Sequence, residues 1–324
     1  DPLLLLLLHP SLRLSSASGA PPPRAMALVA LDAGAGHGPS SPDGLAADAV
    51  RPDETAWDLL RSLRASRGSG LACLDAHLPD GSLGPGELVV VHGAAGAAKS
   101  ALLRSLLAAY VARTERGGHG LPAVLVDADG SFDAGLLAGV LEARGESALR
   151  RRREVGRPAE PEHAVSDAEA VEEALGRLLV LRPDEPQDLL RQLRLLRDVL
   201  AANPAVALLV VDSMSAWQTA TAAFPKASAP FVRESWRALE RLQREHCVAV
   251  VVALREGSTE GADLRCRHLA VARAWLQGPD GAAPPLEGFA LSPAGPRGQP
   301  APAAAATGAF VLSGAGEVVS IDAG

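Results

Sequence analysis

The sequence predicts an α/β fold in which a mostly parallel central sheet is flanked by helices and extended by antiparallel C-terminal strands. Short apolar runs rich in Val alternate with longer stretches of helical period between residues 88 and 254. This alternation is typical of a parallel sheet covered on both faces. Acidic side chains follow two of the apolar runs, and beyond residue 254 short apolar runs are separated by loops of Gly, Pro and Ala.

The chain divides into three predicted parts. Residues 1–50 are rich in Gly, Pro, Ser and Ala, so we expect them to be disordered. We interpret them as a gene-model extension upstream of Met26, with a transit peptide as the alternative. Residues 51–86 are predicted to be a linker and docking segment. Residues 87–324 are predicted to form the core, with a low-complexity loop at 278–307.

Composition limits the function classes. A hydrophobic content of 48% in 324 residues is ample for a core, and the net charge of −7 argues against strong autonomous nucleic-acid binding. The three cysteines, Cys73, Cys247 and Cys266, lack the spacing of a metal site, which suits a reducing, intracellular compartment. No apolar run approaches the roughly 20 residues needed to span a bilayer, so we expect no membrane partner.

Each element is predicted from its local pattern. Apolar residues at helical spacing predict helices at 54–64, from Lys99 onward, at 131–143, at 185–202 and at 231–246. Buried apolar runs predict strands at 88–91, 123–127, 178–181, 205–212 and 247–254, and shorter runs predict strands at 269–276, 287–291, 308–312 and 317–321. The basic run Arg150 to Arg153 is interpreted as a solvated loop or helix end rather than a DNA-binding patch.

The first apolar run leads into a loop of small residues that has the layout of a phosphate-binding P-loop. In such a loop the backbone N–H groups and a helix N-terminus surround the phosphates, the Lys neutralises them and the hydroxyl meets Mg²⁺. The candidate nucleotide-binding residues are Gly93, Ala94, Ala95, Gly96, Ala97, Ala98, Lys99 and Ser100.

The match to the P-loop pattern is imperfect, because Ala98 stands where the pattern has Gly. Lys99 and Lys226 are the only lysines of a chain that otherwise uses Arg, which indicates that a compact ammonium is needed at residue 99. The alternative interpretation is an ordinary strand–turn–helix corner with an incidental Lys-Ser pair.

A second acidic motif follows the strand predicted at 205–212. Four apolar residues followed by Asp212 match the Walker B pattern, whose carboxylate holds Mg²⁺ through water. Ser100 and Asp212 are therefore the candidate metal residues, and ATP and Mg²⁺ the candidate cofactors. The alternative is an Asp that merely ends a strand.

The order of these motifs resembles the RecA-type core of eukaryotic strand-exchange proteins, and among them the recombinase paralogues. The resemblance covers roughly residues 51–322 and is carried by the P-loop strand and by residues 126–133, 175–180, 208–217, 272–275 and 308–317. It implies a RecA-like P-loop NTPase core that docks with other recombinase paralogues in a hetero-oligomer. It also implies a nuclear complex that assists homologous recombination repair of DNA double-strand breaks and crosslinks.

Departures from that family suggest that hydrolysis is weak or absent. The resemblance places Asp129 where RecA-type ATPases have the Glu that activates water, and Arg255 where the recombinase has a Gln that senses the γ-phosphate. Asp129 is one methylene shorter than Glu, and in-line attack is sensitive to displacements of about 1 Å. Asp129 is therefore a degenerate general-base position, and Ala98 weakens the same site.

The resemblance also places DNA contacts in two loops, at 218–230 and 256–268. The candidate DNA-contact residues are Lys226, Arg265 and Arg267, and His268 lies beside them. Both loops have few aromatic residues, whereas a strong single-strand site interleaves aromatic rings with basic residues. We therefore expect single-stranded or branched DNA to be bound mainly through the complex.

Three functions remain open from the sequence. The first is a non-catalytic or weakly ATP-binding subunit of a recombinase-paralogue complex. The second is an active, DNA-stimulated RecA-type ATPase or recombinase, and the third is a self-assembling signalling ATPase of the same superfamily. Turnover and self-assembly of the purified chain distinguish them.

Overall fold

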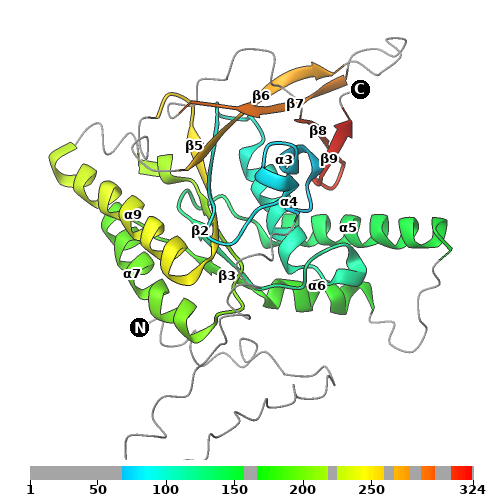
Figure 1. The fold of residues 1–324 in the computed structure, drawn as a ribbon, viewed down its shortest axis with the longest axis horizontal. Helices are drawn as coiled ribbons and strands as arrows, with labels where there is room; N and C mark the ends of the chain where they lie inside the picture. Colours follow the sequence, from blue (N-terminus) through cyan, green and yellow to red (C-terminus); the bar gives the residue numbers. More distant parts are fainter. Residues whose placement is uncertain are drawn as a thin grey trace, which may run out of the picture.

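Figure 1 shows the fold of the chain in a computed structural model, which describes residues 68–156, 166–217, 225–258, 266–276, 286–295 and 308–322. The predictions for residues 1–50 and for the helix at 54–64 lie outside the described residues. So does much of the predicted loop 278–307, although its residues 286–293 form a strand. The strand predicted at 287–291 is thereby confirmed, and it interrupts the predicted loop.

The described residues form one mixed sheet of nine strands in the order β3-β2-β4-β5-β1-β6-β7-β8-β9. Strands β1 to β6 pair in parallel, and β6 to β9 pair in antiparallel fashion. Their bounds are β1 Leu88–Gly93, β2 Ala123–Asp127, β3 Leu178–Leu181, β4 Leu208–Asp212, β5 Ala249–Arg255, β6 Arg267–Leu276, β7 Leu286–Pro293, β8 Gly308–Leu312 and β9 Val318–Asp322.

The predicted α/β class is confirmed, with one correction at the C-terminal edge. We expected the strand at 269–276 to begin the antiparallel part, but β6 begins at Arg267 and runs parallel to β1. The direction changes only at β7, which pairs with β6 over the whole length of that strand. Local apolar periodicity does not distinguish these directions, because it is the same for both pairings.

Helices cover the parallel strands on both faces (Figure 1). On one face, α4 and α5 pack their leucines against alternate strand residues such as Val89 and Leu125. On the other face, α7 and α9 pack against the intervening residues, including Val90 and Val124. The helix bounds are α3 Ala72–Asp75, α4 Lys99–Val111, α5 Ala134–Glu154, α6 Asp167–Gly176, α7 Pro186–Ala202 and α9 Pro225–His246.

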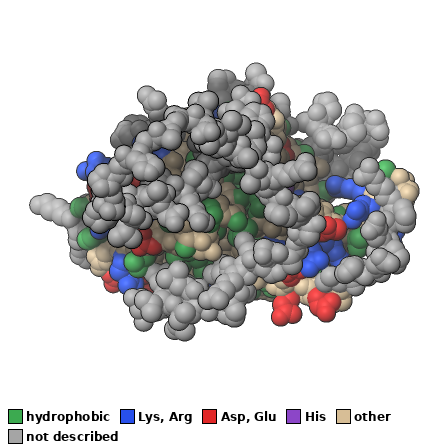
Figure 2. Space-filling view, turned by 60° about the horizontal axis from the view of Figure 1, so that its bottom comes forward, with side chains coloured by type: hydrophobic (Ala, Val, Ile, Leu, Met, Phe, Trp, Pro, Cys, Tyr) green, Lys and Arg blue, Asp and Glu red, His purple; other side chains and the backbone are tan. Residues whose placement is uncertain are grey.

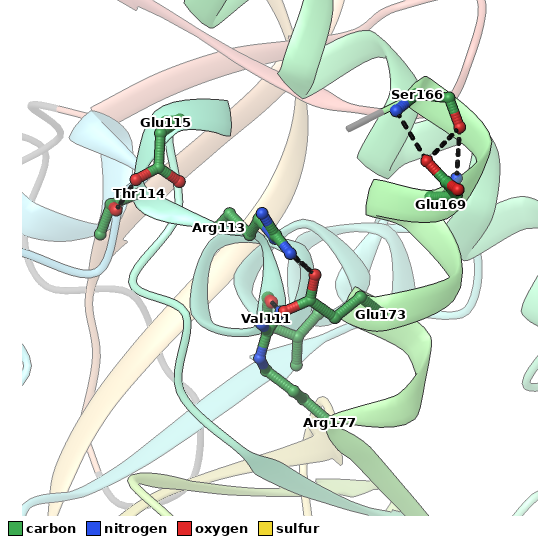
Figure 3. A network of polar contacts seen from close by, with 8 residues as sticks. All are labelled: Val111, Arg113, Thr114, Glu115, Ser166, Glu169, Glu173 and Arg177. Carbon is green, nitrogen blue, oxygen red and sulfur yellow. Dashed lines mark hydrogen bonds and ion pairs between the residues drawn. The ribbon is translucent and has the colours of Figure 1, made fainter. Parts of the chain in front are cut away.

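Three of the longer helices differ from the predictions. Helix α9 begins at Pro225 rather than at residue 231, so residues 225–230 of the predicted DNA-contacting loop 218–230 are helical. The helix expected at 131–143 continues to Glu154, so the run Arg150 to Arg153 forms the exposed end of α5. Helix α6 was not predicted, because the charged stretch before it masks its apolar face. Its start is nevertheless encoded locally. Ser166 and Glu169 form a capping box in which each side chain accepts a hydrogen bond from the other's backbone N–H (Figure 3).

A cluster of charged residues joins α6 to the end of α4. The carboxylate of Glu173 pairs with Arg113 and Arg177, and Arg177 Nη1 donates to the carbonyl of Val111 at 3.0 Å (Figure 3). Arg177 thereby satisfies a carbonyl that the end of α4 leaves without an intrahelical partner. This cluster holds the helix that follows the 93–100 loop.

The segment before β1 belongs partly to the core. Leu71, Cys73 and Leu74 are buried, and the backbone N–H of Cys73 donates to Ser320 Oγ on β9 at 2.9 Å. The later part of the predicted docking segment 51–86 therefore helps to close the fold. Residues 51–67 of this segment lie outside the described residues, and for them docking to a partner stays a prediction.

None of the helices within the described part of the chain has the length and apolarity needed to cross a membrane.

Candidate nucleotide-binding site

The candidate residues meet where three parallel strands end at one edge of the sheet. Strand β1 leads into the 93–100 loop, β2 ends at Asp127 just before Asp129, and β4 ends at Asp212. The register pairs Asp127 directly with Asp212. The structure brings Asp129 and Asp212 close enough to Lys99 for both carboxylates to interact electrostatically with its ammonium.

The loop at 93–100 is shaped by close contacts and by its lysine. A Cβ added to Gly93 would lie 2.7 Å from the carbonyl oxygen of Val271 on β6, so only glycine fits there. Lys99 Nζ donates to the carbonyl oxygens of Gly93 at 2.7 Å and Ala94 at 2.9 Å. The ammonium is therefore held against the loop by two of its carbonyl groups.

Ala98 adopts a conformation that suits glycine better. Its φ is 60° and its ψ is 20°, in the left-handed region, at the residue that precedes the first turn of α4. A non-glycine residue there pays roughly 1–2 kcal/mol because its Cβ approaches a carbonyl oxygen. No side chain caps this helix start, so its N–H groups are available to an anion.

Lys99 lies in a partly buried environment that contains charges of both signs. Burial lowers the pKa of the Lys99 ammonium, and the carboxylate of Asp212 opposes this effect. Arg255, at the end of β5, lowers this pKa further, whereas Asp129 and Glu256 raise it. The cation is thus held beside carboxylates, and it forms no direct ion pair within the part of the chain that the structure describes.

Asp212 is the most strongly perturbed acid of the site. It is 8% exposed, and burial raises its pKa to about 6 from an ordinary value of 3.8. A hydrogen bond with Ser100 opposes the shift, as does the charge of Lys99, whereas Asp129 and Asp127 add to it. A strongly shifted carboxylate that faces a lysine is characteristic of a functional site.

The two acids after β2 have different environments. Asp127 is buried, pairs with Arg182 Nε at 3.0 Å and accepts a hydrogen bond from the N–H of Phe132 at 3.3 Å. Asp129 is exposed and accepts from the N–H of Ser131 at 3.1 Å. Asp127 is therefore committed to holding the fold, whereas Asp129 faces solvent beside Lys99, where it can interact with a ligand.

Arg273 was not identified from the sequence as a site residue. It lies on β6, where its Nη2 is 3.3 Å from the position of a Cβ on Gly96. Arg273 Nε donates to the carbonyl oxygen of Gly96 at 3.4 Å, and Nη1 lies 3.5 Å from Glu287 Oε1. A residue so far from the loop in sequence reaches it because β6 pairs in parallel with β1. Only the strand pairing reveals this, since no local signal connects the two segments.

The residues present fit a magnesium ion better than a transition metal. Ser100 and Asp212 supply a hydroxyl and a carboxylate oxygen, the hard ligands that Mg²⁺ prefers. Within the described residues, no cluster of three or more His, Cys, Asp and Glu side chains could hold a metal.

The candidate DNA-contact residues are only partly described. Arg265 lies outside the described residues, and Lys226 lies in the first turn of α9, where its side chain is not described. Arg267 is exposed at the start of β6, and His268, which we had placed in the loop, is buried in that strand. Figure 2 shows other basic side chains gathered at the right, where α5 and α6 lie, with acidic side chains beside them.

His268 belongs to a buried polar chain next to the loop. His92, the residue before Gly93, has its Nε2 2.9 Å from His268 Nδ1, and His268 Nε2 is 3.2 Å from Cys266 Sγ. Burial lowers the pKa of His92 to about 4, so its ring is neutral near pH 7. These polar contacts connect β1 to the start of β6. His92 and His268 come together only because the two strands pair.

Comparison of the sequence with protein-family models gives no match, and a search of curated proteins finds no similar one.

Proposed function

We propose that the chain is a RecA-like P-loop subunit that binds ATP and Mg²⁺ weakly, hydrolyses ATP poorly, and works in a complex of recombinase paralogues. In this role it assists homologous recombination repair of DNA double-strand breaks and crosslinks in the nucleus. The convergence of Lys99, Asp129 and Asp212 at one edge of the sheet carries the proposal. The partner class and the repair role rest on the sequence resemblance.

Each residue of the site has a role in this proposal. The amides of the 93–98 loop and the ammonium of Lys99 bind the phosphates, and Ser100 and Asp212 hold Mg²⁺, directly or through water. The bound Mg²⁺ neutralises phosphate charge. Because Asp212 must be ionised to attract the cation, its pKa of about 6 predicts that affinity for Mg²⁺-ATP falls as the pH drops through that value.

Two features support weak hydrolysis. Asp129 is a short carboxylate that already accepts a hydrogen bond from Ser131, so it lies back from the position of an attacking water. Ala98 strains the loop that must close around the phosphates. Positioning contributes a large part of phosphoryl-transfer catalysis, so small displacements of these groups are costly.

Nucleotide binding is tested by titrating the purified full-length chain with a fluorescent ATP analogue and Mg²⁺. We expect weak binding that is lost in Lys99→Ala and partly retained in Lys99→Arg, which preserves the charge. Saturable binding that is unaffected in Lys99→Ala would contradict the assignment of the loop. Turnover is measured in parallel with radiolabelled ATP, using Asp212→Ala as the control.

The docking role is tested by purification of nuclear partners with the wild-type chain, with Lys99→Ala and with residues 51–67 deleted. We expect co-purification of recombinase paralogues that survives Lys99→Ala and is lost on deletion. Retention of the same partners without residues 51–67 would remove this segment from the interface. Failure to recover any recombinase paralogue with the wild-type chain would overturn the proposed complex.

The second candidate is an active, DNA-stimulated ATPase. The intact grouping of Lys99 with Asp212 favours it, since these groups are also the ones that an active enzyme needs. Ordinary enzymatic turnover that rises with single-stranded DNA and disappears in Asp212→Ala would establish this candidate and reject the first.

A further inference from the structure

A groove lies between α7 and α9, on the face of the sheet opposite the P-loop helix. Its volume is about 390 Å³. The two helices lie side by side at the left of Figure 1, and their inner faces pack on the sheet. The groove is lined by Leu193, Arg194, Arg197, Ala238, Arg241, Leu242 and Glu245.

The rim of the groove carries an excess of positive charge. Arg197 pairs with Glu245 at 2.8 Å and so links the two helices across the groove. Arg194 on α7 and Arg241 on α9 are exposed, and neither makes an ion pair with any of the described residues. Several other arginines of these helices are paired, such as Arg191 with Asp188 and Arg237 with Glu234. Two uncompensated guanidinium groups thus face one groove from opposite sides.

The floor of the groove is apolar. Leu193 and Leu242 are almost completely buried, and Ala238 is 8% exposed. An apolar floor with cationic rims matches a ligand that combines carboxylates with an apolar side chain. Arg suits the carboxylates because its planar fork binds them bidentately.

We propose that this groove binds an acidic peptide segment of a partner protein. The carboxylates of the peptide pair with Arg194 and Arg241, and an apolar side chain between them packs on the aliphatic stems of these arginines and on the small exposed part of Ala238. This site goes beyond the proposed function, because it needs neither nucleotide nor the residues of the P-loop.

The chemistry of the groove favours a peptide over nucleic acid. A nucleic-acid groove interleaves basic residues with aromatic rings on which bases stack, and none of the described residues that line this groove is aromatic. The whole chain carries a net charge of −7, which repels a polyphosphate at long range. A short acidic peptide carries fewer charges than a long polyphosphate, and salt screens the repulsion between charges more than about 10 Å apart.

The experiment measures fluorescence anisotropy of a labelled peptide, Asp-Glu-Leu-Leu-Asp-Leu-Asp-Glu, titrated with the full-length chain. We expect saturable binding that weakens about tenfold or more in the double variant Arg194→Glu/Arg241→Glu, because both charge partners are reversed. A peptide with Ser in place of every Leu tests the apolar floor, and its binding should also be markedly weaker.

The matched control is Arg152→Glu/Arg233→Glu, which changes the net charge by the same amount at exposed residues outside the groove. It should bind the peptide as the wild type does. Equal loss in both double variants, or no loss in the groove variant, would overturn the proposal. A labelled single-stranded oligothymidylate is titrated in parallel. If it binds through Arg194 and Arg241 while the peptide does not, the groove is a phosphate site and the proposal is wrong.

Discussion

The ionised form of Asp212, which the candidate site needs in order to bind Mg²⁺, destabilises the folded protein. Burial raises its pKa to about 6, so the folded protein binds this proton more tightly than the unfolded chain, whose carboxyl titrates near 3.8. At a pH below the pKa of the unfolded chain, the carboxyl is protonated in both states and does not lower the free energy of unfolding. The destabilisation grows as the pH rises towards and through the pKa of the folded protein, and it is complete at higher pH.

We predict that Asp212→Asn stabilises the protein in neutral and alkaline solution while it weakens Mg²⁺-dependent nucleotide binding. The free energy of unfolding should rise by about 2–3 kcal/mol near pH 8 and by less than half as much near pH 4.5. Urea denaturation at several pH values measures this. A stabilisation that does not depend on pH would show that ionisation of Asp212 is not its cause.

Ala98 gives a second prediction. Replacing it with Gly removes the steric cost of a φ of 60° but adds conformational freedom to the unfolded chain. We expect Ala98→Gly to stabilise the protein by up to about 1 kcal/mol and to tighten binding of ATP. Ala97→Gly is the control. Ala97 is buried and is not among the residues with positive φ, so this change should destabilise. Equal effects of the two substitutions would contradict the role of backbone strain.

At the scale of secondary-structure elements, the contact between α6 and the end of α4 depends on Glu173. Its carboxylate pairs with both Arg113 and Arg177 and is 37% exposed, so solvent screens part of each interaction. We predict that Glu173→Gln lowers the free energy of unfolding by about 1 kcal/mol, as measured by urea denaturation. Glu172→Gln, at the exposed neighbouring residue, should have no measurable effect. The prediction is wrong if the two variants have the same stability.

In the whole molecule, the antiparallel strands are part of the same core as helix α4. Phe310 on β8 is completely buried, and its ring lies 5.3 Å from that of Phe289 on β7. The N–H of Val318 on β9 donates to Ser105 Oγ on α4 at 2.9 Å. These contacts tie the C-terminal strands to the helix that begins at the candidate site.

We therefore predict that Phe310→Ala destabilises the entire fold by about 3–5 kcal/mol, the usual cost of removing a buried aromatic side chain. Circular dichroism and hydrogen exchange of the β4 amides should report the same loss. Leu312→Ala, on the same strand at a residue that is 38% exposed, should cost much less. Normal protection of β4 in Phe310→Ala would show that the C-terminal strands unfold separately.

The strands that the sequence predicted well are those in which nearly every residue is buried. Strands β1, β2, β4 and β5 are buried along nearly their whole length, so their continuous apolar runs are visible without any partner. Helix α7 was also predicted, because its leucines recur at helical spacing. Helix α6 was missed because the charged stretch before it obscures its weak apolar face, in which only Ala170 and Ala174 are buried, although its capping box marks its start locally.

The sequence by itself determined the α/β class, the position of the lysine loop and the acids that follow β2 and β4, because each is written in consecutive residues. The tertiary structure alone decided the direction of β6, the approach of Arg273 to Gly96 and the burial of His268 against His92. It also decided that Arg194 and Arg241 share one groove. The physical reason is that strand pairing and helix packing bring together residues far apart in the chain, and these contacts leave no periodic signal in either segment alone.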